Sequence, residues 1–222
     1  MILCLEDVIG SAQAGSMNQV LERAELFEPG TVTAGRAAKA AKANLQAGNQ
    51  QPEVQRIIAK ATQALQDNNL FQRFALPLQI GRVFINRYDA GMRYDTHYDD
   101  AYIAGIRTDL SFTLFLSEPD SYTGGELELQ SPTGSQALKL PAGSAIVYPS
   151  SQLHAVLPVE RGTRIAIVGW VQSRIKSTEQ RQLIFELTNS IQSLANSATS
   201  PEPALLQLRH VRNNLIRMWG DG

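Results

Sequence analysis

The chain has 222 residues, of which 43% are hydrophobic and 18% are charged, and its formal net charge at neutral pH is −1. This composition excludes wholesale disorder, collagen-like repeats and a coiled coil, and the charge balance gives no global attraction for nucleic acid or anionic membranes. The single cysteine, Cys4, excludes an intramolecular disulfide and a cysteine-built zinc or iron–sulfur site. Three histidines, His97, His154 and His210, are therefore the whole supply for a histidine-based metal site.

The first residues show no sign of an export signal. They contain neither a basic region nor a small-residue cleavage site, and no apolar run in the chain approaches the roughly 20 residues of a membrane-spanning helix. We therefore expect a cytoplasmic protein without a membrane or nucleic-acid partner.

Two segments of the N-terminal third have the apolar spacing of helices, namely residues 11–26 and residues 52–70. Pro52 is suited to open the second helix, because the first turn of a helix does not need the N–H that proline lacks. Between them, residues 35–50 are rich in Ala, Lys, Gln and Asn. We expect a surface loop there rather than a weak helix.

From residue 79 onwards the periodicity changes to two, which indicates strands. The alternating runs are separated by turns that contain glycine or proline, and they cover residues 80–86, 110–116, 126–130, 144–148 and 164–172. Many short strands at this spacing are typical of an antiparallel sandwich or barrel.

Helical patterns return after Gln172, beginning with a potential capping box of Ser177 and Gln180. Two apolar stripes follow, one of Leu183, Leu187, Ile191 and Leu194, the other of Leu205, Leu208, Val211, Leu215 and Met218. We expect the stripes to pack on the β-core; the alternative is a homodimer contact through the helical flanks. The prediction is thus an α+β protein with a mainly β core, divided into a helical flank (1–78), a β-core (79–174) and a helical extension (175–222).

The segment that ends at Asp99 carries the strongest chemical signal. If the chain is extended there, its period of two puts His97 and Asp99 on one face and Tyr98 on the other, so that an imidazole and a carboxylate converge on one point. Asp100 would then face away, and we expect it not to be a ligand.

His154 can join this pair, because a double-stranded β-barrel can return the chain to the same cavity. Two histidines and one carboxylate on one face of a metal form the facial triad of non-haem iron(II) oxygenases, which leaves three coordination positions open. A closed structural zinc site would need a fourth protein ligand, for which the chain offers no cysteine.

Arg164 begins the apolar run 164–172. Its guanidinium is costly to bury without an anion, and its planar fork matches a carboxylate bidentately. The charges of iron(II), Asp99, a dianionic 2-oxo acid and Arg164 sum to zero. A closed site with these groups would avoid a large uncompensated charge.

In their order along the chain, these motifs resemble those of a known family. The iron(II)- and 2-oxoglutarate-dependent dioxygenases of the prolyl 4-hydroxylase-like branch are similar in the spacing Tyr88-x-x-Gly91-x-x-Tyr94-x-x-His97-x-Asp99, then Gly124-Gly125-Glu126-Leu127, Pro141-x-Gly143 and His154-x9-Arg164. The bacterial PKHD-type hydroxylases are more closely similar, in Arg107-Thr-Asp-Leu-Ser, Phe115-Leu-Ser-Glu-Pro-Asp, Leu140-Pro-Ala-Gly-Ser and Tyr148-Pro-Ser-Ser.

The resemblance implies a double-stranded β-helix, or jelly roll, flanked by N-terminal and C-terminal helices. It implies that His97, Asp99 and His154 bind Fe(II), that Arg164 holds the distal carboxylate of 2-oxoglutarate and that Tyr88 assists this cosubstrate. The implied reaction consumes 2-oxoglutarate and dioxygen, hydroxylates an unidentified substrate and releases succinate and CO2, with L-ascorbate as reductant.

Two other functions stay open at this point. One is a cupin-like metalloenzyme that uses no 2-oxo acid, and the other is a non-enzymatic metal-binding jelly roll. Taken singly, His97 could be an ordinary strand histidine, Arg164 could pair with a structural carboxylate, and Tyr88 could serve packing.

Three further residues have expectations of their own. His210 falls in a helical stripe beside arginines, and we expect it at the surface. Trp170 is expected in the core. Tyr94 could line the mouth of a substrate site or simply pack.

Overall fold

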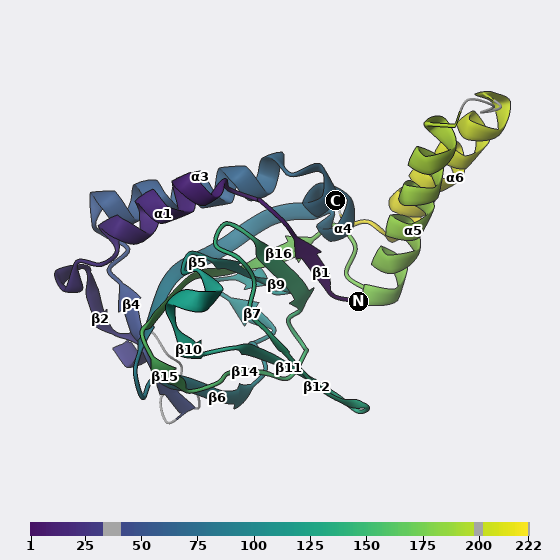
Figure 1. The fold of residues 1–222 in the computed structure, drawn as a ribbon. Helices are drawn as coiled ribbons and strands as arrows, with labels where there is room; N and C mark the ends of the chain where they lie inside the picture. The colour runs from purple at the N-terminus through teal and green to yellow at the C-terminus, as the bar shows by residue number, and fades with distance from the viewer. Residues whose placement is uncertain (33–40, 198–201, 222) are drawn as a thin grey trace.

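The computed structural model describes residues 1–32, 41–197 and 202–221 (Figure 1). Its largest sheet has seven strands in the order β1 (Leu3–Leu5), β13 (Ala145–Pro149), β9 (Leu110–Phe115), β16 (Thr163–Ser173), β5 (Pro77–Asp89), β4 (Leu45–Ala47) and β2 (Phe27–Pro29). A second sheet has five strands in the order β12 (Gly134–Leu138), β11 (Leu127–Ser131), β14 (His154–Val156), β6 (Arg93–His97) and β3 (Lys42–Ala43). All of these pairings are antiparallel.

Two short ladders complete the β-structure. They pair β10 (Thr123–Gly124) with β15 (Val159–Arg161) and β7 (Tyr102–Ile103) with β8 (Ile106–Arg107). The α-helices in the described ranges are α1 (Ser11–Val20), α3 (Pro52–Asp67), α4 (Asn69–Ala75), α5 (Thr178–Ala195) and α6 (Glu202–Trp219). Short 3-10 turns occur at η1 (Ala24–Leu26), η2 (Gly30–Val32) and η3 (Pro119–Ser121). None of the described helices is long and apolar enough to cross a membrane.

The alternation of side chains in the seven-stranded sheet separates a packed face from a hollow one. On β5 and β16, Val83, Ile85, Ile165 and Ile167 belong to the main apolar core. The residues between them on the same strands, among them Phe84, Tyr88 and Arg164, line a cavity instead. A period of two therefore gives one sheet both a core face and a site face.

Helices α1, α3 and α4 lie over the packed face of this sheet (Figure 1). Helix α3 buries Val54, Ile57, Ala61 and Leu65, which recur at helical spacing, and Pro52 stands at its first turn as predicted. The helix ends before Asn68, whose side chain accepts hydrogen bonds from the N–H groups of Leu70 and Phe71 and so begins α4. The predicted helix over residues 52–70 is thus two helices.

Two predictions for the N-terminal flank are wrong in part. The helix expected over residues 11–26 ends at Val20; Leu21 and Leu26 are still buried, but the chain turns between them so that β2 can pair with β4. Within the stretch 35–50, expected to be a loop, residues 42–47 contain β3, the edge strand of the five-stranded sheet, and β4, which lies between β5 and β2 in the seven-stranded sheet; residues 35–40 lie outside the described part. The N-terminal flank is therefore not purely helical, because its residues 42–47 pair with strands of the two large sheets.

Strand predictions for the central region are confirmed. Each of the five predicted runs falls in β5, β9, β11, β13 or β16 with boundary differences of a few residues. The strands of the site, β6 and β14, were not among them, since β14 has three residues and the five residues of β6, Arg-Tyr-Asp-Thr-His, show no apolar alternation.

Helices α5 and α6 form a hairpin that extends away from the sheets (Figure 1). Ser177 caps α5 through its hydroxyl, which accepts from the N–H of Gln180 as predicted. The expected apolar stripe of α5 is wrong in part, because Leu183 and Leu194 are exposed. The buried face is instead Arg181, Ile184, Thr188 and Ile191.

The orientation of α5 follows from two anchors on its core side. Arg181 donates to the carbonyl oxygen of Ile175 at 2.8 Å, and Phe185 packs edge-on against Phe74 of α4 with ring centroids 5.4 Å apart. In α6, Leu205 is buried as a core residue, whereas Val211 and Met218 are exposed.

Candidate metal and cosubstrate site

A cavity of about 590 Å³ lies between the two large sheets. The seven-stranded sheet contributes the inward residues of β5, β9 and β16, and the five-stranded sheet contributes those of β3, β6 and β14. A volume of this size is ordinary for a small-molecule site. All of His97, Asp99, His154, Tyr88 and Arg164 line it.

The structure brings together the three side chains predicted to bind metal. One ligand atom from each of His97, Asp99 and His154 lies within 4.8 Å of the other two. His97 ends β6 and faces His154 of β14 across an antiparallel pair, so that the ring centroids are 4.2 Å apart. Asp99 follows β6 in a short extended segment, where its N–H donates to the carbonyl of Ser150.

Both imidazoles are held with the same nitrogen turned away from the cluster. Nδ1 of His97 lies 2.8 Å from the carbonyl oxygen of Asp95, and Nδ1 of His154 lies 2.8 Å from that of Gln152. A carbonyl oxygen can only accept, so each Nδ1 carries the hydrogen, and in the neutral imidazole this leaves the lone pair on Nε2. This arrangement is typical of histidines that bind metal.

The carboxylate and one imidazole are further tuned by their surroundings. Ser111 of β9 donates its hydroxyl hydrogen to Oδ2 of Asp99 at 2.5 Å, and that hydroxyl also lies 2.8 Å from the hydroxyl of Ser150. Burial, assisted by the neighbouring His154, lowers the pKa of His97 to about 4. The imidazole of His97 is therefore neutral at neutral pH, as a metal ligand must be.

Arg164 of β16 is almost fully buried, with 1% of the residue exposed. Its guanidinium lies between the rings of Tyr88 and Phe115, 5.3 and 5.4 Å from their centroids. Within the described residues, its Nε and Nη2 atoms have no hydrogen-bond partner. A buried guanidinium with two unpaired nitrogens in a cavity is suited to bind an anionic ligand.

Polar groups around Arg164 point to the same kind of ligand. The hydroxyl of Tyr122 is also buried without a hydrogen-bond partner in the described part of the chain. Burial raises the pKa of Tyr88 to about 12, although Arg164 and Asn44 act in the opposite direction. Tyr88 therefore keeps its phenolic hydrogen and can donate it.

Gly125 stands directly behind the arginine with φ at +68°. A Cβ atom added there would lie 2.8 Å from Val159 and 3.2 Å from Cδ of Arg164. The absence of a side chain at Gly125 thus makes room for the guanidinium stem.

Other predicted residues have mixed outcomes. His210 is exposed, as expected, and lies 2.9 Å from the amide of Asn214. Asp100 also lines the cavity, but the cluster of possible metal ligands among the described residues consists of His97, Asp99 and His154 without it, so the expectation that Asp100 is not a ligand stays a prediction. Trp170 lines the cavity rather than the core, and Tyr94 stacks on His97 at 3.7 Å.

Sequence reasoning missed several cavity residues, among them Lys42, Gln46 and Ser111. Lys42 and Gln46 come from the segment expected to be a loop, and Ser111 lies in a strand recognised only for its apolar content. The one available signal was the alternation of polar residues at 42, 44 and 46, which suits an edge strand facing a polar cavity.

Comparison with known proteins agrees with this geometry. Residues 83–172 match the family described as the 2OG-Fe(II) oxygenase superfamily, and residues 179–221 match the PKHD-type hydroxylase C-terminal domain. The chain is 40% identical to a PKHD-type hydroxylase of Xanthomonas campestris and 42% identical to one of Synechococcus sp., in each case over 100% of both chains. A prolyl-4-hydroxylase structure from Pseudomonas putida superposes with a TM-score of 0.57 at 20% identity, over 78% of this chain and 92% of that one.

Proposed function

The chain belongs to the PKHD-type hydroxylases, which are Fe(II)- and 2-oxoglutarate-dependent dioxygenases, and from this premise we propose that it hydroxylates an organic substrate while 2-oxoglutarate is converted to succinate and CO2. The observation that carries the proposal is the buried Arg164, with unpaired nitrogens, in the same cavity as the cluster of His97, Asp99 and His154. A metal site and an anion site in one cavity are what this reaction requires.

In this proposal His97, Asp99 and His154 are the metal ligands. Their free Nε2 lone pairs and the Asp99 carboxylate supply two neutral donors and one negative charge, which suits a divalent iron and leaves positions for other ligands. Ser111 fixes the Asp99 carboxylate by donating to Oδ2. We infer in addition that the two large sheets form a double-stranded β-helix with helical flanks.

Arg164 would pair with the distal carboxylate of 2-oxoglutarate, with the Tyr88 hydroxyl as a further donor. When bound, iron(II) and 2-oxoglutarate supply the oxidising chemistry, with L-ascorbate as the reductant that keeps the iron ferrous. The chain's own residues orient the cosubstrate, and the apolar walls around Arg164 keep water away from it.

The direct test measures succinate formed from 2-oxoglutarate by anaerobically iron-loaded protein, before and after oxygen is admitted. Oxygen-dependent succinate is expected even without the primary substrate, because such enzymes turn over slowly when uncoupled. No succinate, together with no spectral change when 2-oxoglutarate is added to the iron-loaded protein, would refute the proposal.

The ligand assignment is tested by histidine replacements. His97→Ala should abolish iron binding, measured as metal content after desalting, because it removes one of three ligands. His210→Ala is the matched control, since that histidine is exposed on α6, and it should bind iron like the parent protein. Equal iron content in both variants would contradict the assignment.

A further inference from the structure

Lys42 brings a third cationic side chain of the cavity wall from the N-terminal flank. It lies on β3, the edge strand of the five-stranded sheet, directly opposite Tyr94 of β6. Its Nζ atom is 5.5 Å from the centroid of the Tyr94 ring, and that ring stacks on His97. The ammonium group is thus one aromatic ring away from a proposed metal ligand.

The ammonium of Lys42 has no carboxylate partner in the part of the chain that the structure describes. Among residues 1–32, 41–197 and 202–221, no carboxylate lies within 4.0 Å of it. Burial lowers the pKa of Lys42 to about 8, because the charged form is less well solvated there than in water. A partly buried ammonium group without a partner lowers the stability of the folded protein unless an anion binds to it.

The sum of the charges in the cavity, with iron(II) and 2-oxoglutarate bound, indicates where an anion for Lys42 would come from. Iron(II), Asp99, 2-oxoglutarate and Arg164 sum to zero. The two remaining charged groups at the exposed rim, Arg82 and Asp100, cancel each other. Among the described residues that line the cavity, Lys42 is the charge that this sum leaves uncompensated, and a balancing negative charge would come from a molecule that is neither the metal nor the cosubstrate.

We propose that the primary substrate carries a carboxylate and that Lys42 binds it. The inference rests on the proposed function and adds the substrate's chemical class. Aromatic residues form part of the cavity wall, namely Phe84, Tyr94, Tyr98 and Trp170. Trp170 also presents a buried Nε1 hydrogen without a partner in the described residues, so the wall combines apolar contact with a free donor.

The test uses phenylacetate and its neutral analogue phenylacetamide as matched probes, titrated by calorimetry into protein loaded with iron(II) and 2-oxoglutarate under anaerobic conditions. Phenylacetate should bind about tenfold more tightly, the effect of one charged hydrogen bond. Lys42→Met should abolish the preference, and Lys60→Met, which changes an exposed lysine of α3, should retain it.

Three results would overturn the proposal. The first is that the parent protein binds phenylacetate and phenylacetamide with equal affinity, or shows no measurable binding of phenylacetate. The second is that Lys42→Met still prefers phenylacetate. The third is a tenfold or greater loss of 2-oxoglutarate affinity in Lys42→Met, which would assign the lysine to the cosubstrate. Failure of the proposed function is read separately, as absence of iron or 2-oxoglutarate binding in the parent protein. In that case the same titrations on metal-free protein still report whether Lys42 selects the carboxylate.

Discussion

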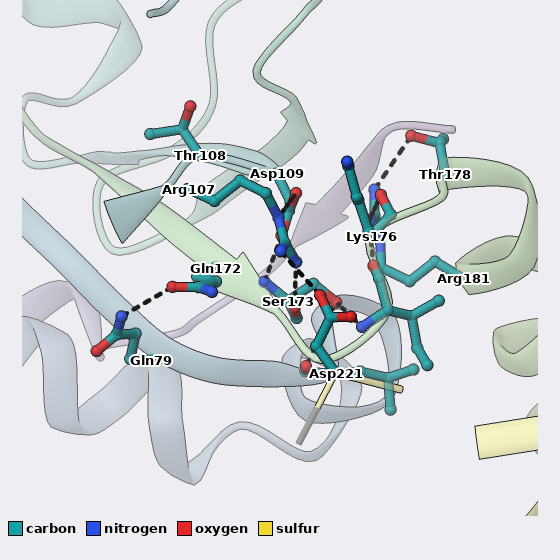
Figure 2. A network of polar contacts seen from close by, with 12 residues as sticks. Gln79, Arg107, Thr108, Asp109, Gln172, Ser173, Lys176, Thr178, Arg181 and Asp221 are labelled. Carbon is teal, nitrogen blue, oxygen red and sulfur yellow. Dashed lines mark hydrogen bonds and ion pairs between the residues drawn. The ribbon is translucent and has the colours of Figure 1, made fainter. Parts of the chain in front are cut away.

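Arg107 of β8 and Arg164 of β16 are both largely buried, yet the groups around the two guanidinium groups differ. Arg107 donates to both oxygens of Asp109, to Asp221 and to the carbonyl oxygen of Ser173, as Figure 2 shows for its carboxylate partners. Arg164 has unpaired nitrogens and aromatic neighbours. The difference teaches that burial alone does not identify a ligand-binding arginine, whereas missing partners do.

Arg107, Asp109 and Asp221 form a cluster that connects distant parts of the chain. Asp109 also accepts from the N–H of Ser173 at 2.8 Å, and Asp221 follows α6, so the start of β9, the end of β16 and the C-terminal hairpin meet at one ion-pair network (Figure 2). The charges of Arg107, Asp109 and Asp221 are paired with one another. The network is therefore structural.

Replacing Arg107 should produce the largest loss of stability. Arg107→Met leaves the Asp109 carboxylate, whose side chain is 6% exposed, without its cation, and the free energy of unfolding should fall by about 3 kcal/mol. Urea denaturation of the metal-free protein measures this. Unchanged stability, or a specific loss of 2-oxoglutarate affinity in the folded variant, would erase the distinction between the two arginines.

Replacing Arg164 should instead change binding. Arg164→Met removes a bidentate partner for the distal carboxylate, so the Kd for 2-oxoglutarate should rise about 100-fold, whereas stability should change little because Nε and Nη2 of Arg164 have no hydrogen-bond partner among the described residues. Anaerobic calorimetry measures the affinity. Arg161→Met, at an exposed position of β15, is the control, and an equal affinity in both variants would refute the role of Arg164.

Lys42 provides the smallest effect and a dependence on pH. The pKa of Lys42 in the folded protein is about 8, below the ordinary 10.5, so the folded state disfavours the charged form of the lysine. Lys42 therefore lowers the free energy of unfolding by its full amount below pH 8, and this effect disappears above pH 10.5. Lys42→Met should therefore raise the stability of the metal-free protein by about 2 kcal/mol at pH 7. A series of denaturation curves should show the gain shrinking as pH rises, and a gain independent of pH would contradict the cause.

The core strands and the metal cluster were predictable because their signals are local. Alternation along β5, β9 and β16 marks two faces, and His97 and Asp99 are two positions apart. The mainly β fold with helices is confirmed by the sheets and by the structural likeness to the Pseudomonas putida enzyme.

The parts that failed depend on contacts between distant segments. Lys42 lies in a two-residue strand whose existence depends on pairing with Tyr94, and no pattern within residues 35–50 announces that partner. The face of α5 is set by Arg181, which reaches back to carbonyl groups before the helix, so an apolar count selected Leu183 instead. Composition cannot report such long-range pairings.

The space left by Gly125 has a consequence for mutational tolerance. Even alanine at this position would press on the stem of Arg164 and on Val159, at a backbone angle that disfavours any side chain. A scan of all substitutions would therefore record position 125 as intolerant, although the residue offers no group to any ligand. In such a map, the sensitivity of the anion site would extend to a residue whose contribution is its small size.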